Sequence, residues 1–314
     1  MTQPGKPKVF RSHGKRLELP AYIPSFSETH IADRRVSANW NGAVAALKLF
    51  SPKALMLSAF DFLYGPRASL EAKEALAEHK TISERLDLPQ AALLFLDSGG
   101  LESISHPDLE FTPEMSYAIQ RKLGADVITL MDFPRSRTGD TRAPVIDEFD
   151  VATGFAALHD GSAGLAAVIH GRSSDELVRQ TTRLASLSVV KVLCVPTKSL
   201  GGNLEKKSET VRALKAVSLD KVLHILAEGS PKAWGDLVAA GADSFDATTW
   251  CRALISPETF RQIAHWIPPR TTCNCVQCRG ELMEVACRSR TDMLVHNLSL
   301  FSSKMDDIRE NVGR

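Results

Sequence analysis

Two aspartates that close apolar runs are the first residues in this sequence of 314 amino acids that could do chemistry. Asp97 ends the run ALLFLD and stands directly before a serine and two glycines, while Asp246 lies within DSFDATT, residues 243–249. Two opposed carboxylates suit glycosidic chemistry, because one can attack or stabilise an anomeric carbon while the other moves a proton on the leaving group. The alternative is that each aspartate only caps the helix or turn that follows its strand.

Four further polar residues follow other apolar runs and extend the set of candidates. They are Asp132, His170, Lys198 and Glu228. A histidine in such a place is often a hydrogen-bonded structural group. Glu228 stands just before an expected helix start at Ser230, where the helix dipole alone would favour an acid. Lys198 has the simpler interpretation of a solvated loop charge.

A cluster of three cysteines indicates a metal site in the C-terminal part of the sequence. The segment CNCVQC places Cys273, Cys275 and Cys278 within six residues, and such crowding in an intracellular chain favours metal over disulfides. A closed structural Zn²⁺ site needs four ligands, so a fourth has to come from elsewhere. His296, in DMLVHNLSL, is the favoured fourth ligand, and Cys287 is its competitor.

A fold has to position these candidate residues. The sequence alternates short apolar runs with amphipathic stretches, a pattern typical of strands that alternate with helices. Eight runs are predicted strands: 19–26, 54–60, 92–97, 126–132, 165–171, 189–196, 221–229 and 243–249. Eight βα units predict an α/β protein built as a (β/α)8 TIM barrel. A doubly wound sheet is disfavoured, because it usually has fewer strands and a glycine fingerprint for phosphate that is not found here. The carboxyl ends of barrel strands form one rim, which would place Asp97 and Asp246 across its mouth.

The segments outside the eight units set the expected domain boundaries. Residues 134–150 form a long polar stretch after the fourth strand and are expected to be a loop insertion. A last barrel helix is predicted at 256–266. We therefore expect a catalytic barrel over 1–267 and a small zinc-binding subdomain over 268–314, the latter with a helix at about 281–307.

Composition narrows the class of protein. Hydrophobic residues make up 44% of the chain, which is enough for a large core. A net charge of +1 argues against strong non-specific electrostatic binding to nucleic acid. No apolar run approaches the ~20 residues of a membrane span, and the basic N-terminus lacks the apolar region of a signal peptide. We expect a cytoplasmic protein without a membrane segment. The sequence has no HxH near the first strand and no GxSxG, which disfavours an amidohydrolase metal centre and a serine hydrolase.

Several segments, in order along the chain, resemble the tRNA-guanine transglycosylases, enzymes that exchange a guanine in a polynucleotide for a 7-deazaguanine base. RLELPAYIPS is similar to the opening strand of that family, FLDSGG to its general acid/base motif, and GADVITLMD to the strand before its base-recognising aspartate. The segment from HILAEG to FDATTWCR resembles the one that leads to the nucleophilic aspartate. CNCVQC followed by HN resembles the zinc motif.

The resemblance implies a role for the two aspartates and their neighbours. Asp246 would be the nucleophile that attacks C1′, and Asp97 the general acid/base, with Ser98 beside it contacting the base. Gly99 and Gly100 would let a base and its sugar approach the backbone closely. A covalent glycosyl-aspartate would form while guanine leaves, and the incoming deazaguanine would then replace the enzyme at C1′.

The remaining candidates would bind the base and the metal. Asp132 would accept hydrogen bonds from the purine N1–H and the exocyclic amine, and His170 and Glu228 complete the base-binding set. The resemblance implies Zn²⁺ as a structural cofactor, with no position left open for water. Its ligands would be Cys273, Cys275, Cys278 and His296.

Departures from the family pattern bear on the substrate. Leu101 replaces an aromatic residue that often follows the two glycines, His170 replaces a glutamine, and CVPTKSLGG replaces a glycine-rich stretch. We expect no RNA-binding domain after the zinc motif. These changes favour a branch that acts on DNA, inserting a 7-deazaguanine such as preQ0, over a tRNA enzyme of the queuosine or archaeosine pathway.

Alternatives from other classes stay open. The chain could be a non-catalytic partner subunit of such an enzyme, or a carbohydrate hydrolase that uses the same carboxylates, although an aromatic content of only 6% disfavours a sugar site. Expected partners are a nucleic acid, DNA or tRNA, and a free 7-deazaguanine base, while a homodimer is implied by the resemblance alone. Candidate contacts to the nucleic-acid backbone are Arg135, Arg137, Lys198, Arg252, Arg279 and Arg288.

Overall fold

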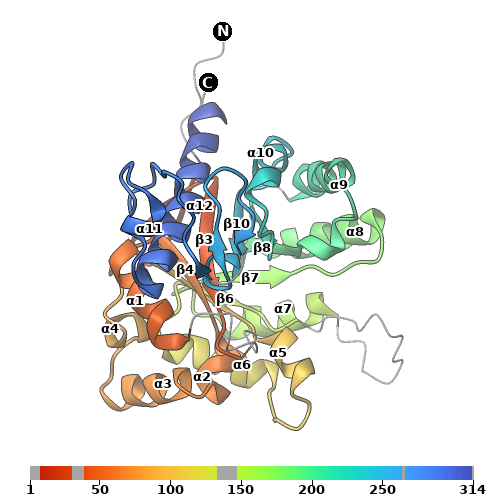
Figure 1. Cartoon of the computed structure of the whole chain (residues 1–314). Helices are drawn as coiled ribbons and strands as arrows, with labels where there is room; N and C mark the ends of the chain where they lie inside the picture. Colours follow the sequence, from red (N-terminus) through yellow and green to blue (C-terminus); the bar gives the residue numbers. More distant parts are fainter. Residues whose placement is uncertain (1–7, 30–38, 133–146, 219, 264–265, 313–314) are drawn as a thin grey trace.

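Eight parallel strands close into a barrel in the computed structural model (Figure 1). The strands are β3 (Ala21–Phe26), β4 (Ala54–Ser58), β5 (Leu93–Asp97), β6 (Val127–Thr129), β7 (Gly164–Val168), β8 (Val190–Pro196), β9 (Val222–Leu226) and β10 (Ser244–Ala247). Each overlaps one of the eight predicted runs, and β10 pairs with β3 to close the ring. The predicted (β/α)8 barrel is therefore confirmed. The structure describes residues 8–29, 39–132, 147–218, 220–263 and 266–312, so most of the expected insertion at 134–150 lies outside the described residues.

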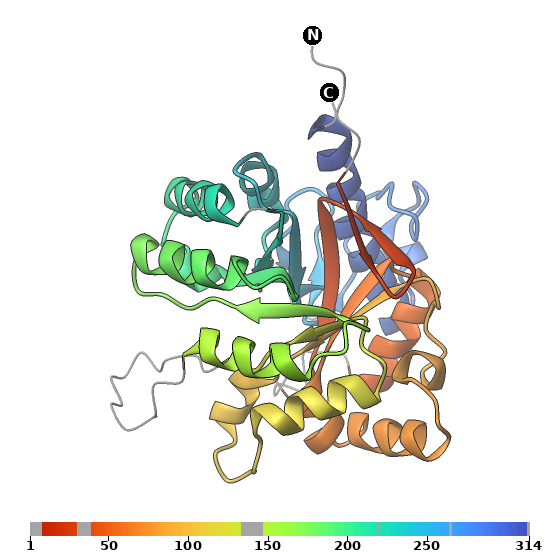
Figure 2. The ribbon, with the colours of Figure 1, turned by 180° about the vertical axis from the view of Figure 1, so that it is seen from behind.

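Helices surround the barrel and connect its strands (Figures 1 and 2). They are α1 (Trp40–Phe50), α2 (Ala59–Tyr64), α3 (Ala68–Ala77), α4 (Ile82–Arg85), α5 (Gly100–Ser105), α6 (Pro113–Lys122), α7 (Glu148–Leu158), α8 (Ser174–Ala185), α9 (Leu204–Val217), α10 (Pro231–Ala239), α11 (Met283–Ala286) and α12 (Arg290–Val312). Side-chain caps fix several starts: Thr112 accepts from the N–H of Met115, and Ser173 accepts from the N–H of Glu176. Within the described residues, no helix combines the length and apolar character that a membrane crossing requires.

A β-hairpin that the sequence analysis did not predict covers the amino-terminal end of the barrel. It consists of β1 (Val9–Ser12) and β2 (Lys15–Glu18), drawn in red in Figure 2. Phe10 and Leu17 belong to the apolar cluster inside the barrel. The hairpin thus closes the end opposite the rim where the strands finish, and a cavity of 330 Å³ lies beside it, away from that rim.

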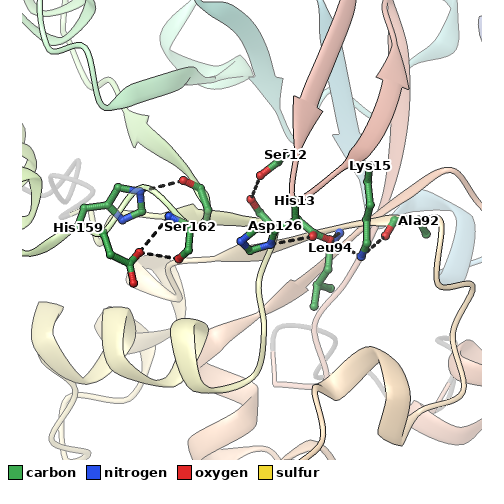
Figure 3. A network of polar contacts seen from close by, with 10 residues as sticks. Ser12, His13, Lys15, Ala92, Leu94, Asp126, His159 and Ser162 are labelled. Atoms are coloured by element: carbon green, nitrogen blue, oxygen red, sulfur yellow. Dashed lines mark hydrogen bonds and ion pairs between the residues drawn. The ribbon is translucent and has the colours of Figure 1, made fainter.

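Asp126, directly before β6, ties the hairpin to the barrel (Figure 3). Its carboxylate accepts from Lys15 Nζ at 2.7 Å and lies 3.1 Å from His13 Nδ1, while its carbonyl accepts from Ser12 Oγ at 2.6 Å. The same buried carboxylate accepts from the N–H of Leu94 at 2.8 Å. One aspartate therefore joins the hairpin to two neighbouring strands at their starts.

The prediction of a helix at 256–266 is wrong. Instead, β12 (Gln262–Ile263) within this segment pairs antiparallel with β11 (Leu254–Ile255), which lies just before it. Phe260 has a φ of +52°, a left-handed conformation that cannot continue a helix. The long helix α12 takes the outer position instead, because it packs against α1, α10 and β3.

Candidate functional site

The candidate side chains of the rim lie at the carboxyl ends of five barrel strands. Asp97 is the last residue of β5, and Asp246 is the third residue of β10. Asp132, His170 and Glu228 follow β6, β7 and β9 within three residues. Because the strands are parallel and the barrel is closed, the structure brings all five residues to one rim.

Asp97 lies in an acidic environment at this rim. Desolvation of its half-buried side chain raises its pKa well above the ordinary value, and the charges of Glu102, Asp132 and Asp246 raise it further. A raised pKa favours the protonated form of the carboxyl relative to an ordinary aspartate, which suits this group to proton transfer with a leaving base. The same neighbours show that the carboxylates of Asp97 and Asp246 lie within electrostatic range of each other.

The two glycines after Asp97 are required by the packing of their own loop. Gly99 has a φ of +77°, and a Cβ there would lie 2.6 Å from the Cβ of Phe60. A Cβ on Gly100 would lie 2.3 Å from the backbone oxygen of Asp132 and 2.5 Å from its Oδ1. Side chains at either position would force the loop away from α2 or from the segment that follows β6. This packing is a sufficient reason for both glycines, whatever ligand the loop meets.

Asp132 is buried and held from both sides. Ser98 Oγ donates to its Oδ1 at 2.7 Å, and His170 Nε2 lies 2.8 Å from its Oδ2. Since a carboxylate only accepts, His170 Nε2 must carry a proton for this bond. Each oxygen keeps a second lone pair, so the carboxylate can still accept hydrogen bonds from a ligand in a fixed orientation.

Asp246 is also buried, and its two hydrogen bonds to the described residues both go to Oδ1. The N–H of Ala227 donates at 2.8 Å, and His224 Nε2 lies 3.2 Å away. His224 is fully buried in β9, and its Nδ1 lies 2.8 Å from Ser244 Oγ. His224 is not among the predicted site residues, although a histidine in the centre of the apolar run KVLHILAEG is a signal of a buried polar group that needs a partner.

The carboxylate of Glu228 accepts hydrogen bonds from three neighbouring residues. Its Oε2 accepts from Lys207 Nζ and Thr197 Oγ1, both at 2.6 Å, and its Oε1 accepts from the N–H of Ser230 at 3.2 Å. The carboxylate is buried beside the start of α10, and the ion pair with Lys207 compensates its negative charge there. These contacts give Glu228 a structural role at the rim in addition to its predicted base contact.

Two further buried acids near Asp97 were not predicted. Glu102, on α5, accepts from Ser27 Oγ at 2.9 Å. Asp61, on α2, accepts from the N–H and the hydroxyl of Thr29, and its burial raises its pKa to about 7. The charge of Glu102 is a further cause of that shift. Nothing in the spacing of these residues marked them, because their proximity arises from the folding of β4 and β5 side by side.

Three cysteines and one histidine converge behind β11 and could hold a metal ion. The ligand atoms of Cys273, Cys275, Cys278 and His296 all lie within 4.8 Å of one another, and all four residues are buried. His296 Nδ1 lies 3.3 Å from Cys275 Sγ and 3.2 Å from Cys278 Sγ. Three thiolates and one imidazole form a donor set of the kind found in closed tetrahedral zinc sites.

The environment of His296 fits a metal ligand. Its Nε2 lies 3.0 Å from the backbone oxygen of Ile255, so an N–H on Nε2 donates to that carbonyl and leaves Nδ1 free to coordinate. Cys287, the competing candidate, lies outside the set of four, with its Sγ 3.9 Å from that of Cys278. The favoured ligand set is therefore the one that the fold brings together.

The basic candidates for nucleic-acid contact differ in exposure. Arg279, Arg288 and Lys198 are exposed, whereas Arg252 is half-buried next to the short helix that follows β10. Arg135 and Arg137 lie outside the described residues. The exposed side chains remain available to phosphate, which alone gives no sequence preference.

A closed βα barrel with an acidic rim belongs to the class of enzymes that work at the carboxyl ends of their strands, and its carboxylates suit glycosyl transfer. The family model described as queuine tRNA-ribosyltransferase matches residues 68–314, and the chain belongs to this family of base-exchange glycosyltransferases. No curated protein matches the chain. The family resemblance expected from the sequence is thus confirmed, while the matched description names tRNA as substrate.

Proposed function

We propose that this protein exchanges guanine in a polynucleotide for a 7-deazaguanine base through a covalent glycosyl-aspartate. The observation that supports it best is the contrast between two acids at one rim. Asp97 has a raised pKa and suits proton transfer, whereas Asp246 is held through one oxygen by two neighbouring donors. Such a difference in environment is how two like groups take different catalytic roles.

In the proposed first step, Asp246 attacks C1′ of the target nucleotide while the bond from C1′ to guanine N9 breaks. Asp97 donates a proton to the departing guanine, which therefore leaves as a neutral base. In the second step, the incoming deazaguanine gives its N9 proton to Asp97 and attacks C1′, which releases the Asp246 carboxylate. One N-glycosidic bond replaces another, so the exchange needs no energy source.

Recognition of the base is assigned to the group around Asp132. Its carboxylate would accept from the N1–H and the exocyclic amine of guanine, and the bonds from Ser98 and His170 would hold it in place for that purpose. The Leu101 side chain, 48% exposed on α5, would contact the base in place of an aromatic ring. The target guanine must leave its stack to reach these groups.

Two substrates, DNA and tRNA, are candidates. The substitutions at Leu101 and His170 favour DNA and a base such as preQ0, whereas the description of the matched family favours tRNA. Of the two, we propose DNA, with tRNA as the alternative. A homodimer or a complex with a partner subunit would be compatible with either substrate.

We further propose that Cys273, Cys275, Cys278 and His296 hold Zn²⁺ as a structural cofactor within a subdomain over residues 268–314. The metal would cross-link the loop that carries the cysteines to α12. It would leave no position for water, so it takes no part in the exchange. The barrel over residues 1–267 would carry the chemistry.

The test is a covalent trapping experiment with DNA and tRNA in separate arms. The wild-type protein should form an adduct that survives a denaturing gel with one of the two, and Asp246→Asn should abolish it because an amide cannot attack C1′. Asp236→Asn, at an exposed position of α10, is the matched control and should form the adduct normally. No adduct and no exchange of labelled guanine by the wild type with either nucleic acid would favour the non-catalytic partner subunit.

A further inference from the structure

The buried imidazole of His224 stands directly behind the proposed nucleophile. Its Nε2 lies 3.2 Å from Asp246 Oδ1, and its Nδ1 lies 2.8 Å from Ser244 Oγ. In the register of the barrel, His224 is the direct neighbour of Ser244 across the pair β9–β10. The two residues that contact the imidazole therefore come from alternate positions of one strand, on the same face as each other.

The protons of this group can be assigned from the chemistry of its members. Asp246 Oδ1 only accepts when ionised, so Nε2 must carry the proton that joins it to His224. A neutral imidazole then accepts at Nδ1, and the Ser244 hydroxyl is the donor that satisfies it. In an imidazolium, Nδ1–H donates to the Ser244 oxygen and the bond to Asp246 is unchanged. In both cases, Nε2–H points at Oδ1.

The surroundings of His224 hold this arrangement in place. The ring stacks on Phe95, with centroids 6.5 Å apart and an angle of 24° between the planes, and it is fully buried inside the barrel. The second donor to Oδ1, the N–H of Ala227, belongs to a residue with a φ of +57°. A left-handed alanine is uncommon, and here its conformation accompanies a hydrogen bond to the rim carboxylate.

We propose that His224 is a positioning residue, which together with the Ala227 N–H fixes Asp246 Oδ1 so that Oδ2 is the oxygen that attacks C1′. This inference rests on the proposed function, because it assigns the atoms of the same nucleophile. In the part of the chain that the structure describes, both donors to Asp246 approach Oδ1, and Oδ2 is the oxygen left for the new bond.

The chemistry of the two steps follows from this assignment. When the C1′–Oδ2 bond forms and the C1′–N9 bond breaks, Oδ1 becomes the carbonyl oxygen of a glycosyl ester, still held by both donors. When the incoming base forms its bond to C1′, the electron pair of the C1′–Oδ2 bond returns to the carboxylate. Donors fixed on Oδ1 stabilise that returning charge without reorganising, so they assist release of the enzyme.

Two substitutions of His224 distinguish the effect of its hydrogen bond to Asp246 from the effect of its ring volume. His224→Gln can place an amide N–H near the position of Nε2, whereas His224→Asn is too short and reaches only the position of Nδ1. We expect the asparagine variant to lose about 100-fold in kcat, the effect of removing one donor to a developing charge, while the glutamine variant stays within about tenfold of wild type. KM should change little in both variants, because Asp132 and its partners bind the base.

Trapping of the adduct in the wild type separates the two proposals. If the wild type forms no adduct, the proposed function fails. If it does, and a folded, metal-containing His224→Asn variant exchanges guanine at the wild-type kcat, the inference about His224 is overturned. Equal losses in the asparagine and glutamine variants would also overturn it, since the amide N–H would then bring no benefit.

A measurement on the wild-type protein tests the hydrogen bond from His224 to Asp246 even if the variants do not fold. Nitrogen-15 NMR of histidine-labelled wild-type protein reports which ring nitrogen carries the proton. We expect a protonated Nε2 on His224, with Nδ1 either unprotonated or, in the imidazolium, protonated too. A resonance pair with a proton on Nδ1 and none on Nε2 would refute the hydrogen bond to Asp246 Oδ1.

Discussion

Asp61 makes the stability of this protein depend on pH in a direction that can be worked out. The carboxyl is almost completely buried, and desolvation raises its pKa from the ordinary 3.8 to about 7, with the charge of Glu102 adding to the shift. The folded protein therefore keeps the proton to a higher pH than the unfolded chain does. As the pH rises from about 4 to 7, the unfolded chain releases the proton first, and the folded state loses stability relative to it.

The size of the effect follows from the two pKa values. One pKa unit corresponds to about 1.4 kcal/mol, and the loss accumulates from the unfolded value up to the folded value. Between pH 5 and pH 7.5, ionisation of Asp61 should lower the free energy of unfolding on the order of 2 kcal/mol. Asp61→Asn removes this contribution, because an amide does not titrate. The variant also loses a carboxylate oxygen that accepts from Thr29 or Glu28, but that cost does not change with pH.

Urea unfolding at pH 5 and at pH 7.5 would measure the difference. The free energy of unfolding of Asp61→Asn minus that of wild type should rise on the order of 2 kcal/mol between the two pH values. Asp236→Asn is the control, because the exposed carboxylate of Asp236 stays in water in both states. If the curves of Asp61→Asn and wild type run parallel over this range, the carboxyl does not hold its proton in the folded protein and the reasoning is refuted.

Two further predictions concern the rim and the metal cluster. Gly100→Ala should lower base exchange at least about tenfold with the barrel still folded, because its Cβ collides with Asp132, whereas Gly235→Ala, where a Cβ meets nothing within 4 Å, should be active. Equal activity in the two variants would mean that the loop adapts freely. Metal analysis should find about one zinc per chain in wild type and Cys287→Ser, and none in Cys278→Ala. Loss of zinc in the Cys287→Ser variant would place Cys287 among the ligands.

The parts of the fold that follow from local pattern were predictable. Each strand of a parallel barrel is buried on both faces, so it reads as a short apolar run, and the polar residue that follows it marks the rim. Asp97 and Asp132 were found in this way. The cysteine cluster was equally visible, since its spacing constrains three ligands to one turn.

The parts that depend on contacts between distant segments were not predictable. The bonds of His224 to Asp246 and Ser244 need the register between β9 and β10, which one sequence does not contain. The hairpin at residues 9–18 is held by Asp126, more than a hundred residues away, and its short strands carry little periodic signal. The predicted helix at 256–266 does not form because the chain turns through a left-handed conformation at Phe260, which the sequence does not reveal.

The position of α12 has a consequence for how the barrel is made. Its Arg309 donates to the backbone oxygen of Pro20, just before β3, and its Phe301 meets the ring of Tyr22 edge-on at 5.3 Å. The helix thus packs on the first barrel strand, which pairs with the last one. During synthesis on the ribosome, the surface of β3 that contacts α12 stays uncovered until α12 has emerged, so we expect the barrel to be completed only after α12 has been translated.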